Sequence, residues 1–249
     1  PITAITVHLQ WLDALITLAV PPKTLTMAEA KEQTKEWGEE CDLYEKEADM
    51  LEAFLDIIQD SDILTGWNSE GYDIPYTVNR VARVLSKDDT RRFCLWKQLP
   101  KKREYEKYGK SAETYDLVGR VHLDSLELYR KYTYEERHTY RLDAIGELEV
   151  GEKKTVYEGT LDQLYNNDFR TFIEYNRQDV ALLDKLDKKL RFIDLSNELA
   201  HANTVLLQTT MGAVAVTEQA IVNEAHRRGM RVPNRPKRDP EASTAAGAY

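Results

Sequence analysis

The sequence predicts an α/β fold, in which short strands alternate with longer amphipathic helices. Apolar, partly β-branched runs at 2–9, 14–20 and 63–67 have the length of strands. Longer stretches at 47–58 and 169–192 repeat apolar residues every three or four positions, which is typical of helices with one buried face. Because turn formers separate the two kinds of stretch, we expect helices packed against a sheet.

Composition and hydropathy fit a globular protein. Of the 249 residues, 42% are hydrophobic and 31% are charged. No apolar run reaches membrane-spanning length and no basic-then-apolar leader begins at Pro1, so we expect no membrane partner and a cytoplasmic location. Cys41 and Cys94 lack metal-ligand spacing, which favours free thiols in a reducing compartment.

The net charge of −9 argues at first against binding to phosphate backbones. The charges are unevenly distributed, however. Acidic residues concentrate between 29 and 62, whereas Lys and Arg cluster at 91–103 and at 227–238. Net charge therefore leaves open whether the protein binds nucleic acid.

The first third of the chain predicts a hairpin and a helix. The runs 2–9 and 14–20 flank a short polar segment, and two prolines end the second run. The acidic stretch 26–43 predicts a solvated helix with loops. Within 47–58, an apolar stripe predicts a helix that faces the core, formed by Met50, Leu51, Phe54, Leu55 and Ile58.

A buried strand at 63–67 ends in the turn formers 68–71. Asn68 and Asp73 are therefore expected at its carboxyl end, where ligands bind in open α/β sheets. A carboxylate at this position can hold a metal ion. The alternative is that Asp73 only caps the helix that starts near Ile74.

The middle of the chain predicts a helix at 76–85 and a weakly patterned, basic stretch at 86–119. Its segment 105–111 suggests a hairpin tip, with a surface loop as the alternative. The run 118–128 predicts a strand that enters a helix. We expect Asp124 to cap that helix and leave it out of the site.

Short helices are predicted at 139–146 and 160–165, before the long helix 169–192. Tyr175 and Asp179 lie four residues apart on that helix and therefore share a face. A carboxylate binds hard divalent cations and a phenol can orient an attacking water, which suits metal-assisted hydrolysis. The alternative is an amphipathic helix that happens to carry both residues.

After residue 192 the alternation of strands and helices gives way to a helical pattern and then a linker. The stretch 199–225 predicts a long helix with a possible break at 211–212, and 234–249 predicts a linker. We therefore expect two regions, 1–192 and 193–249.

Together, two motifs resemble those of a known family. Thr65-Gly-Trp-Asn68 followed by Asp73 resembles the second exonuclease motif of family B DNA polymerases, and Tyr175 with Asp179 resembles the third. The similarity is greatest to the tailed-phage replicative branch and covers nearly the whole chain. It implies a ribonuclease H-like 3′–5′ exonuclease fold, a mixed sheet flanked by helices, with 193–249 leading toward the polymerase palm.

The resemblance also implies a site. Asp73 and Asp179 would be ligands for two divalent Mg or Mn ions, Tyr175 would position the attacking water, and Asn68 would contact the terminal nucleotide or support the Asp73 loop. The implied partners are the single-stranded 3′ end of a DNA primer and the palm, fingers and thumb of the polymerase. The hairpin at 105–111 would help the primer end move between polymerising and editing sites, in the host cytoplasm if the protein is phage-encoded.

The chain departs from the family in one respect. The first exonuclease motif, Asp-any-Glu on the first strand, does not occur before Asp62, and the acidic motifs of the palm are missing. We therefore expect weak metal binding and little or no cleavage by this chain. The alternatives are a noncatalytic nucleic-acid-binding module, a stand-alone exonuclease acting on RNA or DNA, and a structural domain whose motifs are accidental.

Overall fold

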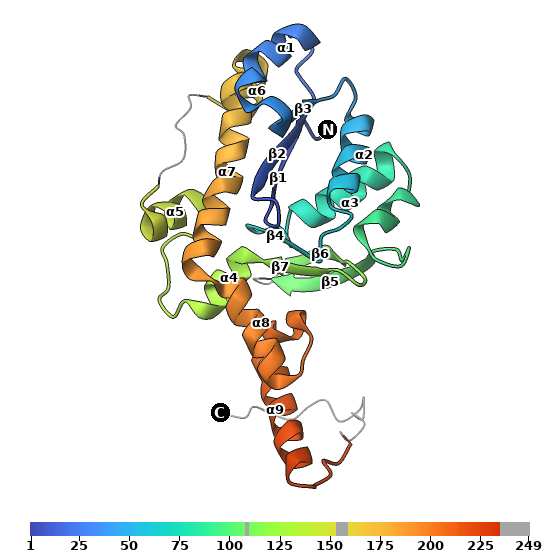
Figure 1. Ribbon diagram of the computed structural model, residues 1–249, viewed down its shortest axis with the longest axis vertical. Coiled ribbons are helices and arrows are strands. Elements are labelled where there is room, and N and C mark those ends of the chain that lie inside the picture. Colours follow the sequence, from blue (N-terminus) through green and yellow to red (C-terminus); the bar gives the residue numbers. More distant parts are fainter. Residues whose placement is uncertain (108–109, 153–158, 235–249) are drawn as a thin grey trace. The chain divides into compact units, whose positions relative to one another are not determined.

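The computed structural model describes residues 1–107, 110–152 and 159–234 (Figure 1). The chain divides into two compact units, Pro1–Leu195 and Ser196–Tyr249. The first unit contains strands and helices and has the mixed α/β character that the sequence predicts. In the described part of the second unit, all regular structure is helical.

The first sheet contains the predicted hairpin. β1 (Ala4–Leu9) pairs antiparallel with β2 (Ala14–Ala19), and β2 pairs parallel with β3 (Cys41–Leu43). The acidic stretch forms α1 (Met27–Thr34), which begins with a capping box at Thr26, and the 3₁₀ helix η1 (Lys35–Glu40). The sequence did not predict β3, because three residues are too few for a periodicity to show.

Two further small sheets belong to the same unit. β4 (Ile63–Gly66) pairs parallel with β7 (Val121–Asp124). β5 (Lys101–Lys107) and β6 (Lys110–Asp116) form an antiparallel hairpin, which confirms the predicted hairpin, although tip residues 108 and 109 lie outside the described residues. Within the described residues, the expected mixed sheet is thus divided, and β1, β2 and β3 keep its mixed character.

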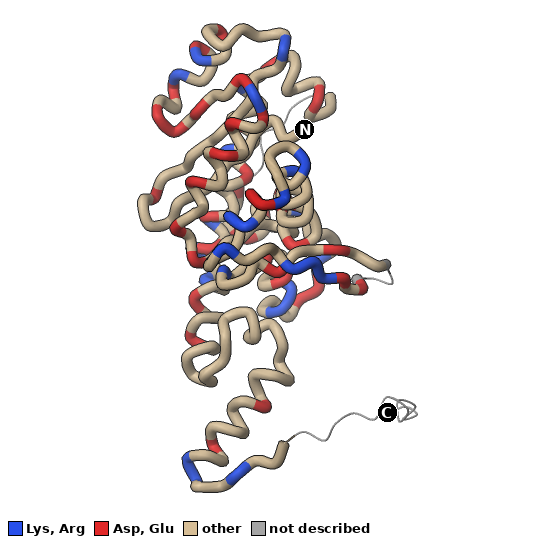
Figure 2. Tube along the Cα trace, turned by 90° about the vertical axis from the view of Figure 1, so that its right-hand side faces the viewer, with Lys and Arg blue, Asp and Glu red and all other residues tan. Residues whose placement is uncertain are grey.

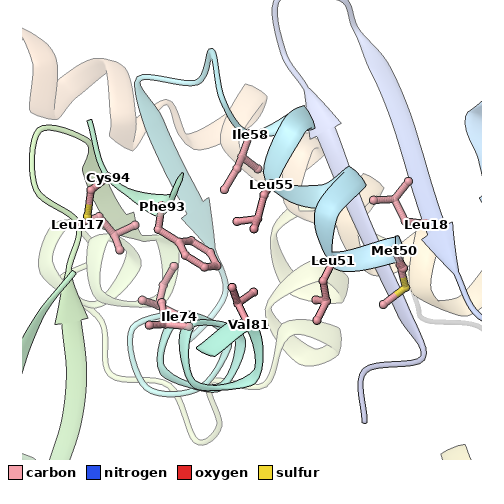
Figure 3. Close-up of a cluster of buried hydrophobic side chains, with 11 residues drawn as sticks. Leu18, Met50, Leu51, Leu55, Ile58, Ile74, Val81, Phe93, Cys94 and Leu117 are labelled. Carbon is pink, nitrogen blue, oxygen red and sulfur yellow. The ribbon is translucent and has the colours of Figure 1, made fainter. Parts of the chain in front are cut away.

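The main core lies between the first sheet and two helices. α2 (Glu47–Ile57) and α3 (Asp73–Val84) pack with the 3₁₀ helix η2 (Asp89–Phe93). Most of the predicted stripe of α2 is buried, whereas Phe54 is only partly buried. Figure 3 shows side chains of this core, which include Leu18, Met50, Leu51, Leu55, Ile58, Ile74, Val81, Phe93, Cys94 and Leu117.

α7 (Phe169–Leu190) covers the other side of the first sheet, and further helices pack on α7 or on β4 and β7 (Figure 1). They include α4 (Ser125–Tyr132), α5 (Leu142–Val150) and α6 (Leu161–Asn167). α7 packs along β1 and β2, and contacts α5 and α6. It ends where Arg191 adopts a left-handed conformation with φ 53°.

The helical region after α7 is more broken than predicted. α8 (Phe192–Asn203) is followed by η3 (Leu207–Met211) and α9 (Ala213–Arg227). The break at Gly212 is confirmed, and a second break lies at Thr204, where φ is 52°. Asn223 of α9 donates to the Asn203 carbonyl at 2.9 Å and joins the two helices. The predicted linker lies almost wholly outside the described residues.

Among the helices described, none is both long and apolar enough to cross a membrane.

Candidate active site

The parallel pairing of β4 and β7 brings two strand ends to one edge of their sheet. Gly66 is the partner of Asp124, so Asn68 and Ser125 follow the two strands at the same edge. The Thr65 hydroxyl donates to the Leu123 carbonyl at 2.7 Å and links the strand ends further. The sequence-based expectation that β4 delivers polar side chains to a carboxyl edge is therefore met by the pairing.

The loop formed by residues 68–72 connects this edge to α3. Asn68 adopts a left-handed conformation with φ 60°, which Asn tolerates better than most residues. The Asn68 carbonyl accepts hydrogen bonds from the amides of Gly71 and Tyr72 at 3.2 and 3.1 Å. These bonds make the 68–72 loop a tight turn that ends immediately before Asp73.

Asp124 holds this loop from the neighbouring strand. Its Oδ1 accepts from the Asn68 amide and its Oδ2 from the Glu70 amide, both at 3.0 Å. Oδ1 also accepts from the Leu126 amide at 2.9 Å, which confirms the prediction that Asp124 caps α4. Burial raises the pKa of Asp124, although the three N–H donors favour the charged carboxylate.

Ser69 fixes the loop at a second point. Its hydroxyl lies 2.9 Å from Nε2 of His122 on β7, and Ser69 itself is buried. A Cβ on Gly66 would approach the Ser69 Cβ to 2.8 Å, so the strand must end in glycine for the loop to fold back.

Asp73 is the first residue of α3, directly after Tyr72, which takes the N-cap position without a side-chain capping bond. The Asp73 carboxylate accepts from its own backbone N–H. Asp73 therefore lies one position inside the helix start that the capping alternative assigned to it, in the first turn of α3, where a negative charge is favourable. The residue is exposed, yet the protein atoms around its carboxylate displace enough water to raise its pKa. A carboxylate on an exposed residue in the first turn of a helix has oxygen atoms that suit a ligand for an external cation.

Two tyrosines flank Asp73 on the surface of α3. The rings of Tyr72 and Tyr76 are stacked, with centroids 5.6 Å apart and planes inclined by 9°. Tyr72 is 62% exposed and Tyr76 is 41% exposed. Exposed rings of this kind can stack on nucleic acid bases, and neither ring was singled out from the sequence.

α7 carries the second predicted motif. Tyr175 and Asp179 are both half-buried, and the Asp179 Oδ1 is shielded from solvent. The helix is fixed in rotation by Arg177, whose Nη1 donates to the Leu15 carbonyl at 2.9 Å and to the Glu40 carbonyl at 3.0 Å. Because Arg177 points into the sheet, Tyr175 and Asp179, two residues away on either side, project from a different face of the helix.

A small cavity lies between the end of β4, the start of α4 and the second half of α7. It has a volume of about 20 Å³ and is lined by Trp67, which precedes Asn68, by Ser125, which follows Asp124, and by Leu183 of α7. Leu183 lies one helical turn beyond Asp179 on the same face. The edge formed by β4 and β7 is thus adjacent to the part of α7 that follows Asp179.

The basic stretch of the sequence is partly neutralised by ion pairs. Arg103 of β5 pairs with Glu70 of the 68–72 loop and, at 2.9 Å, with Asp116 of β6. Lys102 pairs with Glu113 at 2.6 Å. Figure 2 shows Lys and Arg interleaved with Asp and Glu along the chain, so the hairpin is a mixed surface that is linked to the loop.

The donor chemistry of the predicted site fits Mg or Mn, because both ions prefer carboxylate oxygens. In the part of the chain that the structure describes, no group of three or more His, Cys, Asp or Glu side chains is arranged to hold a metal ion. Asp73 and Asp179 have the donor atoms that such an ion prefers, and among the described residues neither belongs to a group of three or more such side chains.

Sequence reasoning underestimated Asp124 because a capping residue and a loop-holding residue have the same local pattern. The signal that distinguishes them is tertiary, since it requires β4 and β7 to be neighbours.

Comparisons with known proteins identify the family of the chain. Residues 1–145 match the family model for the exonuclease domain of family B DNA polymerases, a region that includes Asn68 and Asp73. The chain is 29% identical over 192 residues to the DNA-directed DNA polymerase of Escherichia phage RB69, which covers 76% of this chain and 21% of the relative. It is also 29% identical over 182 residues to the enzyme of Enterobacteria phage T4, covering 72% of this chain and 20% of the relative.

A cellular relative is similar as well. The DNA polymerase delta catalytic subunit of Bos taurus is 26% identical over 218 residues, covering 79% of this chain and 19% of that protein. The chain thus spans about a fifth of the length of these relatives. Since the family model matches more than half of the chain, this protein belongs to the family of exonuclease domains of family B DNA polymerases.

Proposed function

We propose that this chain is the proofreading region of a DNA-directed DNA polymerase and contributes to removal of the 3′-terminal nucleotide of single-stranded DNA. The observation that carries the proposal is the position of Asp73. It begins α3 directly after the 68–72 loop, which follows the end of β4 beside β7, and it belongs to an exposed part of the surface. Its position within the family match supports the assignment.

In this proposal Asp73 and Asp179 hold divalent Mg or Mn, together with carboxylates beyond these two. When bound, two such ions activate a water molecule and stabilise the leaving 3′ oxygen. Tyr175 lies one turn before Asp179 and orients the water. Asn68 and the stacked pair Tyr72 and Tyr76 hold the terminal nucleotide through hydrogen bonds and base stacking.

The partners follow from the relatives, which are DNA polymerases about five times as long as the aligned segment. We propose that palm, fingers and thumb regions complete the protein and deliver the primer end to this site. The phage relatives favour the cytoplasm of a bacterial host as the place of action.

A DNA-shortening assay tests the proposal. A single-stranded DNA labelled at its 5′ end is incubated with the chain and Mg or Mn, and 3′ shortening is followed as a ladder. Any ladder should vanish in Asp73→Ala and Asp179→Ala and persist in Asp162→Ala, a control at an exposed aspartate on α6. A ladder that survives the first two substitutions would contradict the assignment.

Metal binding, measured with and without an added strand, provides the complementary test. Because two carboxylates hold two divalent ions poorly, calorimetric titration of the chain with Mn should show weak binding. Two tight sites would contradict this expectation. Adding an amino-terminal apolar strand with an Asp-any-Glu motif should raise both metal affinity and cleavage, and Asp179→Ala in that protein should abolish cleavage.

The same assays separate the other functions. Binding of single-stranded DNA that weakens steeply with salt, without product in the extended protein, would identify a noncatalytic binding module. Shortening of RNA in preference to DNA would identify a stand-alone exonuclease.

A further inference from the structure

We propose that Asp124 is a positioning residue of the exonuclease site, which holds the 68–72 loop so that Asn68, Tyr72 and Asp73 are presented together. The inference rests on the proposed function, since it concerns the residues assigned there to DNA and metal. It extends that function to a residue on a different strand, which itself lies outside the catalytic motifs.

The two carboxylate oxygens of Asp124 accept from different sets of backbone amides. Oδ1 accepts from the amides of Asn68 and Leu126, and Oδ2 accepts from the amide of Glu70. A helix cap needs only one acceptor for one amide near the start of α4. The two additional bonds both go to the 68–72 loop, so most of the hydrogen bonding of Asp124 serves the loop and not the helix.

These bonds are made by a buried side chain. Asp124 is only 5% exposed, and a buried polar group whose partner is removed destabilises its surroundings more than an exposed one does. The loop also contains Asn68 in the left-handed conformation, which Asn tolerates but adopts less often than helical or extended backbone, so a bond to its amide helps to hold it. Asp124 provides that restraint from a strand whose register with β4 is fixed by pairing of Gly66 with Asp124.

Two substitutions separate the roles of the carboxylate. Asp124→Ser keeps a side-chain oxygen that can cap α4 but cannot reach two loop amides. Asp124→Asn keeps an oxygen for Asn68 and Leu126 and places an amide N–H group where Oδ2 accepted from Glu70. Thr160→Ala, which removes the cap of α6, is the matched control for the loss of a helix cap elsewhere.

Hydrogen exchange followed by NMR gives the structural result. In Asp124→Ser we expect exchange of the Asn68 and Glu70 amides to rise at least tenfold, while exchange of the Leu126 amide stays within threefold of wild type. In Asp124→Asn only the Glu70 amide should show the large increase. Unchanged exchange at Asn68 and Glu70 in the serine variant would overturn the proposal.

Binding of a fluorescein-labelled single-stranded DNA, followed by anisotropy, gives the functional result. We expect affinity to fall at least fivefold in Asp124→Ser, less in Asp124→Asn, and not in Thr160→Ala. Faster loop exchange with unchanged DNA affinity would reduce Asp124 to a structural role and overturn the proposal. If the wild-type chain itself does not bind DNA, the proposed function fails first, and the exchange data show separately whether Asp124 holds the loop.

Discussion

Nε2 of His122 lies 2.9 Å from the hydroxyl of Ser69, which links the middle of β7 to the loop that presents Asp73. The pKa of His122 is lowered to about 4, chiefly by burial; the nearby Glu70 opposes this change and Arg103 adds to it. The imidazole is therefore neutral in the folded protein at pH values where it is protonated in the unfolded chain.

This difference predicts an acid-sensitive contribution to stability. Between pH 6.5 and about 4 the unfolded chain binds more protons at His122, so the contribution is complete above pH 6.5 and decreases as the pH falls through that window. A pKa difference of this size corresponds to roughly 3 kcal/mol. Urea unfolding of wild type and His122→Gln at several pH values measures the difference between the two proteins.

We expect the stability advantage of wild type over His122→Gln to shrink steadily from pH 6.5 to 4. Wild type must be compared with His122→Gln at each pH because other groups titrate as well. Burial raises the pKa of Asp73, Asp124 and Asp187, and their contributions to the free energy of unfolding change with pH in the opposite direction. His138→Gln, at an exposed ring, is the control for losing an imidazole. A difference that does not vary with pH would contradict the prediction.

The buried guanidinium of Arg177 predicts a large destabilisation on truncation. Arg177→Met leaves the Leu15 and Glu40 carbonyls and the Glu40 carboxylate without their donor, and should lower the free energy of unfolding by about 3 kcal/mol. Arg170→Met on the same helix removes only the exposed pair with Glu36 and should cost less than about 1 kcal/mol. Chemical denaturation measures both, and equal effects would show that Arg177 does not anchor α7.

The contact between α5 and α7 predicts that one substitution changes stability in opposite directions in two backgrounds. A Cβ on Gly146 would lie 2.6 Å from a methyl of Leu182, so Gly146→Ala should destabilise wild type by roughly 1 kcal/mol through overpacking. In a Leu182→Ala background the clash is gone, and the better helix propensity of alanine should make the same substitution stabilising by up to about 1 kcal/mol. A double-mutant cycle measures the coupling, and the same sign in both backgrounds would contradict the close contact.

The stacked pair beside Asp73 predicts a loss of DNA binding without loss of folding. Tyr72→Ala should weaken binding of single-stranded DNA about tenfold, because stacking on an aromatic ring contributes roughly 1 to 3 kcal/mol per base. Tyr134→Ala, at a fully exposed tyrosine between α4 and α5, is the matched control and should leave affinity unchanged. Fluorescence anisotropy measures both, and equal affinities would remove Tyr72 from the DNA-binding surface.

The sequence by itself determined the elements whose residues repeat with a clear period. The stripe Met50, Leu51 and Leu55 identified α2, and strand-length apolar runs identified β1, β2 and β4, because burial of one face imposes the period of the helix or strand. The motifs around Asp73 and Asp179 likewise identified the family, since their residue types and order are local properties of the chain.

Only the tertiary structure decided how those elements act on one another. The short strand β3 became a strand because β2 was available to pair with it. Asp124 bonds the 68–72 loop as well as α4 because β7 lies beside β4. Arg177 is buried and bonded to two carbonyls because α7 packs on β2 and η1. Each of these roles depends on a partner distant in sequence, and no local period or propensity specifies which distant group a polar side chain will meet.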